Sequence, residues 1–568
     1  MAHSDNPQSL VRDLSTGRLS RRQFVQRAAA LGISSSLIGA VLAACGSSAA
    51  TATTAPQPTT APAGGGGATA TTGAAATKAP AAATAPAASP GANTRTGITA
   101  AEWNPEAIKA QAGTLKVDTK ADVAKITPLD YKGKLTVWYT GPDASTPKIQ
   151  ADFDTQFWAA WKETYPGIPL TVGDNVQNIA YNDLIDKLRT SAAGNAAPDM
   201  VRLQILGGVE FAAKGQLAEI NLADFGYKPE DFWTGALKSV TWNGKVYGIP
   251  TNNETMAFIW NKKIFEKAGL DPNTAPATWD DVVKFSKQIK DKTGKSGFGM
   301  VAKVNAGNTP FRFMPVLWAY GSGALDEAEP NPTYEKALIN NDGGIAALQT
   351  YYDMYVRDQS VPTSALTNTQ TENGDLFISE QIAMVISHPS EYASMQDKLA
   401  KATGSDKQIA QEVVDSMAYG LIPAGPVRRA VVFGGSNMHI FADKFTGHTV
   451  DRKAANAFMA FSTGPEWSTK QWAWTGSNPG VLTGFKTEWM KQRLDQIKFL
   501  ENTTAMLPYG IPFPAIPEST TIMNNIVPEM LQNALTKKMT VKQAADDAAD
   551  KINKLIAQRK SQKLWTGF

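Results

Sequence analysis

Strand-like and helix-like segments alternate through the first part of the globular sequence. Residues 134–140, 168–172 and 199–204 are short and rich in β-branched or apolar side chains, which predicts strands. Between them, residues 153–161 and 181–191 carry apolar side chains at the spacing of one helix face. Strands separated by helices pair in parallel, with the helices on the faces of the sheet. The alternation therefore predicts an α/β fold.

Two further helices are marked by their first residues. The motif Thr278-Trp279-Asp280-Asp281 is a capping box, which predicts that a helix starts there. Thr540 is placed to cap a long C-terminal helix with one apolar face. Asp546, Asp547 and Asp550 lie on the opposite face of that helix, so we interpret them as solvated side chains and not as an acidic site.

The first 44 residues have the features of an export signal. Arg21 and Arg22 precede a mildly apolar stretch, residues 28–44, and this order fits the twin-arginine pattern. The motif Leu42-Ala43-Ala44-Cys45 resembles the lipobox of bacterial lipoproteins, which implies cleavage before Cys45 and lipid on its thiol. The alternatives are an ordinary basic signal for the general export route and a chance position of the cysteine.

A low-complexity segment follows the predicted signal. Residues 46–98 consist almost entirely of Ala, Thr, Pro, Gly and Ser. A segment without large apolar side chains cannot offset the entropy lost on ordering. Residues 45–98 are therefore expected to be a lipidated, flexible spacer that holds the globular part on the outer face of the cytoplasmic membrane. Residues 99–127 receive no assignment.

Charge and cysteine content argue against several classes of protein. The formal net charge is +3, and the excess arginine lies in the first 44 residues, so the rest lacks the basic surface that nucleic-acid binding needs. One cysteine excludes an intrachain disulfide and a cysteine-ligated zinc or iron–sulfur site. The four histidines are scattered, so we expect neither metal nor cofactor. Motifs of serine hydrolases, zinc proteases and phosphate-binding loops are absent.

Short motifs spread along the chain have the order and spacing of one protein family. They are Tyr165-Pro166-Gly167-Ile168, Ala193–Asp199, Ala212–Leu217, Gly244–Pro250, Trp260–Leu270, Thr278–Asp281, Ile382–Met384, Gly434-Gly435, Ala454-Ala455 and Phe458-Met459. From about residue 134 to residue 555, the chain resembles family 1 extracellular solute-binding proteins of ABC importers, the sugar-binding group.

That resemblance implies two α/β lobes of the type II periplasmic-binding-protein fold, with the ligand in the cleft between them. Lobe 1 would comprise residues 128–252 and 436–500, and lobe 2 residues 253–435 and 505–568. Lobes of this kind close about a hinge when ligand binds. The implied function is a monomeric receptor, not an enzyme, that captures a carbohydrate, expected to be an oligosaccharide, and delivers it to an ABC permease.

The resemblance also implies candidate ligand contacts. A sugar offers hydroxyls and apolar ring faces, so its site needs aromatic side chains together with carboxylates, amides or arginines. Glu254, at the crossover between lobes, matches an acidic position that contacts sugar in the family. The other expected contacts are Tyr139, Asp143, Arg202, Phe311, Arg312, His388, Tyr392, Gly435, Ser436, Asn437, Trp472 and Trp474.

Several of these assignments leave alternatives open. A cation at Arg202 departs from the maltose-type pattern, and if Arg202 and Arg312 converged on one pocket, the ligand would be anionic, for example a polyol phosphate. Polyamines and peptides are further alternatives, and a secreted glycoside hydrolase is a less favoured one. His388 suits a cleft contact and a buried structural hydrogen bond equally. Either Trp472 or Trp474 could close over a sugar ring.

Overall fold

The computed structural model describes residues 102–140, 148–180, 183–205, 207–304, 308–327 and 333–561. The predictions for Arg21, Arg22, Cys45, the spacer and Asp143 concern residues outside these ranges. None of the described helices is both long and apolar enough to cross a membrane.

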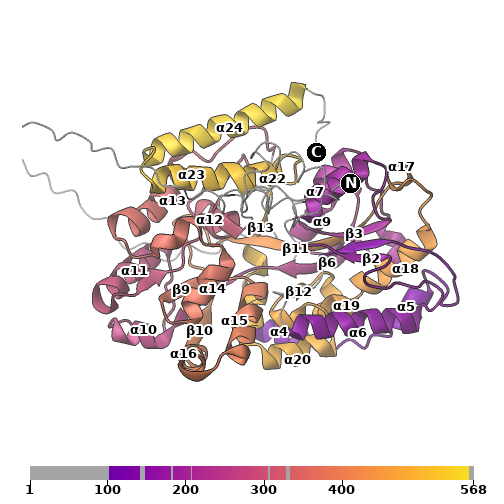
Figure 1. The fold of residues 1–568 in the computed structure, drawn as a ribbon, viewed down its shortest axis with the longest axis horizontal. Helices are drawn as coiled ribbons and strands as arrows, with labels where there is room; N and C mark the ends of the chain where they lie inside the picture. The colour runs from indigo at the N-terminus through magenta and orange to yellow at the C-terminus, as the bar shows by residue number, and fades with distance from the viewer. Residues whose placement is uncertain are drawn as a thin grey trace, which may run out of the picture. The chain divides into compact units, whose positions relative to one another are not determined.

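The larger sheet contains the strands predicted at residues 134–140 and 199–204 (Figure 1). Its order is β12-β6-β11-β3-β1-β2, with β13 paired to β11. The strands are β1 (Val137–Tyr139), β2 (Val176–Asn178), β3 (Met200–Gln204), β6 (Ile249–Glu254), β11 (Val431–Ile440), β12 (Asn478–Pro479) and β13 (Gly510–Pro512). β1 pairs in parallel with β2 and β3, as the alternation predicts, whereas β11 is antiparallel to β3 and β6.

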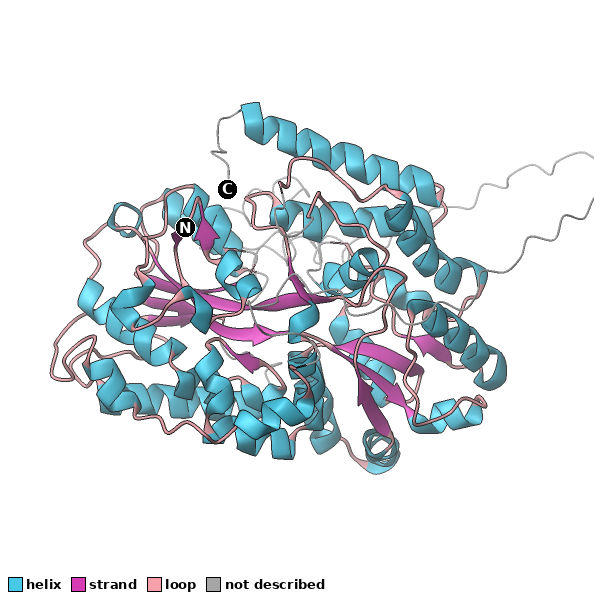
Figure 2. Cartoon of the chain, turned by 180° about the vertical axis from the view of Figure 1, so that it is seen from behind, coloured by secondary structure: helices cyan, strands magenta, loops and turns pink. Residues whose placement is uncertain are grey.

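Helices cover this sheet (Figure 2). They are α4 (Pro105–Gln111), α5 (Thr119–Ala124), α6 (Lys148–Thr164), α7 (Leu184–Ala193), α8 (Gly208–Ala213), α9 (Thr234–Ser239), α17 (Asp443–Thr446), α18 (Arg452–Thr463), α19 (Pro465–Lys470), α20 (Glu488–Gln496) and α21 (Lys498–Ala505). Phe157 and Trp161 of α6 pack edge-on against Phe458 of α18, and all three are buried. The Trp161 indole donates to the Ile168 carbonyl (3.0 Å), which fixes the chain just beyond the helix. Strands β4 (Thr241–Trp242) and β5 (Lys245–Val246) form a separate hairpin.

A second sheet has the order β10-β7-β9-β8. Its strands are β7 (Ala257–Asn261), β8 (Ser296–Phe298), β9 (Ile382–Ser387) and β10 (Met417–Gly420). Its helices are α10 (Lys262–Lys267), α11 (Trp279–Thr293), α12 (Asn308–Ala319), α13 (Asp342–Tyr352), α14 (Gln370–Ile378), α15 (Pro389–Lys401), α16 (Gly404–Asp415), α22 (Ser519–Thr521), α23 (Val527–Leu535) and α24 (Val541–Ser561). The predicted capping box is confirmed: Asp281 N–H donates to the Thr278 hydroxyl and the Asp281 carboxylate accepts from Thr278 N–H.

Two long segments of backbone connect the two sheets. β6 ends at Glu254 and, after Thr255 and Met256, the chain enters the second sheet as β7. β11 spans both cores, because Val431 and Val432 belong to the core of the second sheet and Met438 and Ile440 to that of the first. Separate cores joined by continuous strands are the basis of a two-lobed α/β fold, so the predicted fold class is confirmed.

One predicted strand is wrong. Residues 168–172 form no strand, and the second strand of the large sheet begins at Val176. The cause is Asn175, whose side chain accepts from Thr171 N–H (2.8 Å) and donates to the carbonyls of Leu135 and Pro169. These side-chain hydrogen bonds replace the ladder that a strand would make there.

The described part of residues 99–127, which the sequence left without an assignment, packs against the helices and loops that surround the large sheet. Trp103 is buried beside Trp233 and Phe485, and its indole donates to the Thr504 carbonyl (3.1 Å). Further along, Val123 packs in the core beneath α18, and its carbonyl accepts from the Tyr165 hydroxyl. The part of residues 99–127 that the structure describes is thus an integral layer of the globular fold.

Candidate functional site

Glu254 is the last residue of β6, at the point where the chain leaves the first sheet. One carboxylate oxygen accepts from the Ser477 hydroxyl (2.9 Å) and the Asn252 amide (2.9 Å). The other lies 2.7 Å from Nε2 of His388. Burial alone would raise the pKa of Glu254, but His388, Ser477 and Arg202 outweigh it and lower this pKa to about 2. Glu254 is therefore a carboxylate at physiological pH.

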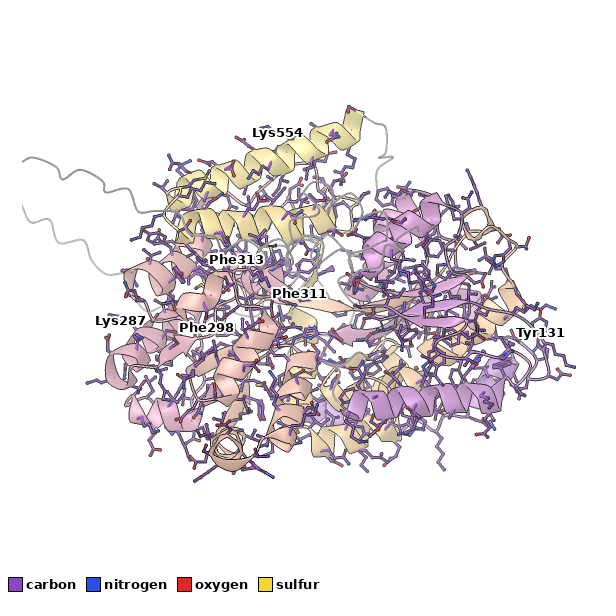
Figure 3. All side chains as sticks on the ribbon, viewed as in Figure 1. Tyr131, Lys287, Phe298, Phe311, Phe313 and Lys554 are labelled. Carbon is purple, nitrogen blue, oxygen red and sulfur yellow. The ribbon has the colours of Figure 1, made fainter. Side chains whose placement is uncertain are left out.

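His388 connects the Glu254 carboxylate to the helices of the second lobe. It is the N-cap residue of α15, and its Nδ1 lies 3.1 Å from the Ser390 hydroxyl, which leaves Nε2 facing Glu254. The imidazole meets the Phe311 ring edge-on at 5.9 Å. Phe311, on α12, packs in turn on Phe513 and lies beside Gly434 of β11, where an added Cβ would come within 3.2 Å of its ring (Figure 3).

Arg202 approaches the same residues from the first sheet. Its guanidinium donates to the Asn252 side-chain oxygen (2.9 Å) and the Thr251 hydroxyl (3.2 Å), both on β6. Its Cζ lies 3.9 Å from the centroid of the Trp472 ring and 5.5 Å from that of Tyr139. Arg202 and Glu254 are therefore linked through one side chain, because Asn252 accepts from the arginine and donates to the glutamate.

A second buried carboxyl group, that of Asp154, interacts electrostatically with Tyr139 and Arg202. Asp154 of α6 accepts from the Gln471 amide (3.0 Å), and both residues are buried. Burial raises the pKa of Asp154 to about 6, although Gln471 and Arg202 act against it. Burial likewise raises the pKa of Tyr139 to about 12. Polar and aromatic contacts thus continue from Phe311, through His388, Glu254 and Arg202, to Asp154.

Two comparisons with known proteins bear on this arrangement. A family model described as bacterial extracellular solute-binding protein matches residues 143–469, which is more than half of the chain. The chain belongs to this family. Among curated relatives, the arabinooligosaccharide-binding protein of Bacillus subtilis (strain 168) is 23% identical over 364 residues, covering 63% of this chain and 77% of its own length.

Solved structures of solute-binding proteins share the fold. A solute-binding protein from Thermotoga lettingae, bound with α-D-tagatose, covers 75% of this chain and 100% of its own, with a TM-score of 0.60 and 21% identity. The GacH receptor of Streptomyces glaucescens, solved unliganded and with acarbose, covers 75% of this chain and 99% of its own, with a TM-score of 0.61 and 19% identity. At these identities the likeness concerns the fold.

Six of the residues that were predicted as ligand contacts of this solute-binding protein lie in one connected group. They are Tyr139, Arg202, Glu254, Phe311, His388 and Trp472. Nearby, Gly435 of β11 adopts φ +129°, and an added Cβ would lie 2.2 Å from the Asn252 carbonyl. Ser436 accepts from the Thr251 hydroxyl through its carbonyl (2.8 Å). The crossing strand is therefore held tightly against β6.

Four other residues point into structural contacts. Arg312 forms a buried ion pair with Glu391 (2.6 Å), so its charge already has an acidic partner. Tyr392 stacks on Phe499 at 4.6 Å, and Trp474 stacks on Phe153 at 6.0 Å. The Asn437 amide donates to the Ser239 hydroxyl (3.0 Å) within the core.

The sequence reasoning missed four polar residues of the group: Asp154, Asn252, Gln471 and Ser477. Asn252 could have been suggested by its place two residues before Glu254, since alternate residues of a strand share a face. The other three come from α6 and from the segment that leads into β12, and no local pattern links them to Glu254. In the described part of the chain, no group of three or more His, Cys, Asp or Glu residues is arranged to hold a metal ion.

Proposed function

We propose that this solute-binding protein is an extracytoplasmic lipoprotein that captures a carbohydrate, an oligosaccharide in our proposal, and delivers it to an ABC permease. The observation that carries the proposal is the group of polar and aromatic contacts at the crossing strand of a chain in this family. Relatives named for arabinooligosaccharide, tagatose and acarbose ligands support a carbohydrate.

The chemistry of the group suits a sugar. Glu254, held by His388, offers an ionised acceptor for hydroxyl groups, Arg202 offers donors, and Phe311 offers an apolar face. Arg202 and Glu254 lie on strands of the first sheet, and Phe311 and His388 on helices packed around the second, so a ligand that touched all of them would hold the lobes together. Such a site binds and releases without chemistry, and we assign no catalytic role to any residue.

The anchoring part of the proposal rests on the sequence alone. Lipid on Cys45 and the spacer of residues 46–98 would keep the receptor close to its permease. Replacing Cys45 with Ser should then move the protein from the membrane fraction to the soluble fraction of fractionated cells. If the Cys45→Ser protein stays in the membrane fraction, the lipid anchor is ruled out.

Thermal unfolding of the full chain with a carbohydrate panel tests the binding function. The panel comprises mono- and oligosaccharides, with polyol phosphates, polyamines and peptides for comparison. A ligand present at 100 times its dissociation constant stabilises the folded protein by about 2.7 kcal/mol, which shifts the unfolding midpoint measurably. Stabilisation by peptides or polyamines but by no carbohydrate would contradict the proposal, as would turnover of a substrate.

A paired substitution locates the site. Glu254→Gln should weaken binding of the identified sugar by about 10- to 100-fold, since hydrogen bonds to a charged group contribute about 1.5–3 kcal/mol. Glu412→Gln is the matched control, because Glu412 pairs with Lys263 at an exposed position of α16. Equal affinities for both variants would remove Glu254 from the site.

A further inference from the structure

Three arginines are buried in the described part of the chain, and one of them lacks an acidic partner. Arg312 is 2% exposed and pairs with Glu391, and Arg559 is 1% exposed and pairs with Glu518. Arg202 is 6% exposed and forms no ion pair with a described residue. Its guanidinium donates to the neutral oxygens of Thr251 and Asn252.

The two carboxylates that attract Arg202 electrostatically form their hydrogen bonds with other side chains. Glu254 interacts with His388, Ser477 and Asn252. Asp154 accepts from the Gln471 amide (3.0 Å). Both lie near enough to attract Arg202, but neither forms the short paired contact that Arg312 and Arg559 have. Leaving a buried charge without such a contact is costly.

The guanidinium is held in a fixed orientation. It lies over the Trp472 ring, and its Nε and one terminal nitrogen are directed to β6. The planar fork of an arginine matches the two oxygens of a carboxylate or phosphate. The Trp472 indole N–H is itself buried without a hydrogen-bond partner among the described residues. Two kinds of donor, and no paired acid, therefore occur together beside the Glu254 group.

We propose that the ligand of this receptor is an acidic carbohydrate, one that carries a carboxylate or phosphate group, and that Arg202 binds that group while Glu254 binds hydroxyls. This inference rests on the proposed carbohydrate-binding function and narrows its ligand class. Arg202 would thereby be the residue that discriminates acidic from neutral sugars.

Isothermal titration calorimetry of the full chain with matched probes tests the inference. The probes are trigalacturonic acid and its fully methyl-esterified form, and glucose 1-phosphate and glucose. The acidic member of at least one pair should bind about 10- to 100-fold more tightly than its neutral partner. A carboxylate source and a phosphate source are distinguished by which pair shows the preference.

Three variants assign the preference to Arg202. Arg202→Met should abolish it, and Arg202→Lys should keep part of it, because lysine retains the charge without the planar fork. Arg452→Met removes one arginine charge at an exposed position and should bind as the wild type does. If Arg202→Met does not fold, Arg202→Lys still tests the inference, because a weaker preference for the acidic sugar shows that the planar guanidinium contributes to it.

Sodium sulfate against sodium chloride at equal ionic strength gives a readout independent of the sugar. Sulfate should raise the unfolding midpoint of the wild type more than that of Arg202→Met. Tight binding of neutral sugars, equal in wild type and Arg202→Met, would overturn this inference and leave the carbohydrate receptor standing. A sulfate effect that needs Arg202, without binding of any carbohydrate, would instead contradict the proposed function and support the anion contact.

Discussion

The buried ion pair between Arg312 and Glu391 yields a prediction that separates structural from ligand-binding arginines. The two side chains are each 2% exposed, and the Arg312 Nη2 lies 2.6 Å from a Glu391 oxygen that also accepts from His388 N–H. Replacing Arg312 with Met leaves the Glu391 carboxylate buried without its cation. Breaking a buried pair from one side costs about 3–5 kcal/mol.

The expected change in melting follows from that cost. A cooperative unit of roughly 150–250 residues shifts by about 2–4 °C per kcal/mol, so the midpoint of Arg312→Met should fall by roughly 6–20 °C. Glu391→Gln in the same chain should recover much of the loss, because Gln still accepts from His388 N–H and carries no charge. Differential scanning calorimetry of wild type, both single variants and the double variant measures the coupling.

The pH dependence of the single variant provides a second check. Burial already raises the pKa of Glu391, and Arg312 acts against that rise. Without the arginine, this pKa should rise further above its value in the unfolded chain, so the loss of stability should shrink as the pH falls toward about 4. An unchanged midpoint together with lost ligand binding would refute the reasoning and return Arg312 to the ligand site.

Three further predictions concern buried groups near the first sheet. Gly248→Ala should destabilise the fold by about 1–3 kcal/mol, because its Cβ would lie 2.5 Å from Nδ1 of buried His439, and a melting curve equal to wild type would contradict this. Burial lowers the pKa of His439 to about 4, so stability should be lost as pH falls from about 6.5 toward 4; His439→Gln should flatten that slope in denaturant titrations at several pH values. Burial raises the pKa of Asp154 to about 6, so its ionisation opposes folding as the pH rises from about 4 to 6. Asp154→Asn should therefore raise the free energy of unfolding by up to about 3 kcal/mol at pH 7, measured by the same titrations. A loss of stability at pH 7 would show that the fold needs the carboxylate.

Local patterns predicted those parts of the fold that depend on neighbouring residues. The capping box at Thr278 and the parallel pairing of β1 with β3 follow from short segments of sequence, and both are present. The strand expected at residues 168–172 failed because a single side chain, Asn175, takes over the backbone hydrogen bonds there. Composition and periodicity do not report which side chain will do so.

The packing of residues 102–127 could not be predicted from the sequence for a related reason. Trp103 is buried only because Trp233, Phe485 and the Thr504 carbonyl surround it. Those partners lie more than a hundred residues away and carry no motif that points back to Trp103. A lone tryptophan beside a short helix gives no indication of what will cover it.

The same limit governs the candidate site, as a comparison of two arginines shows. Arg202 and Arg312 were both expected to contact ligand. Arg312 meets an acid 79 residues further along the chain, which absorbs its charge inside the second lobe. Arg202 meets amide and hydroxyl oxygens and an indole ring, which fix its orientation without absorbing its charge. Whether a buried cation remains available to a ligand is therefore decided by its partner, and tertiary structure supplies that partner.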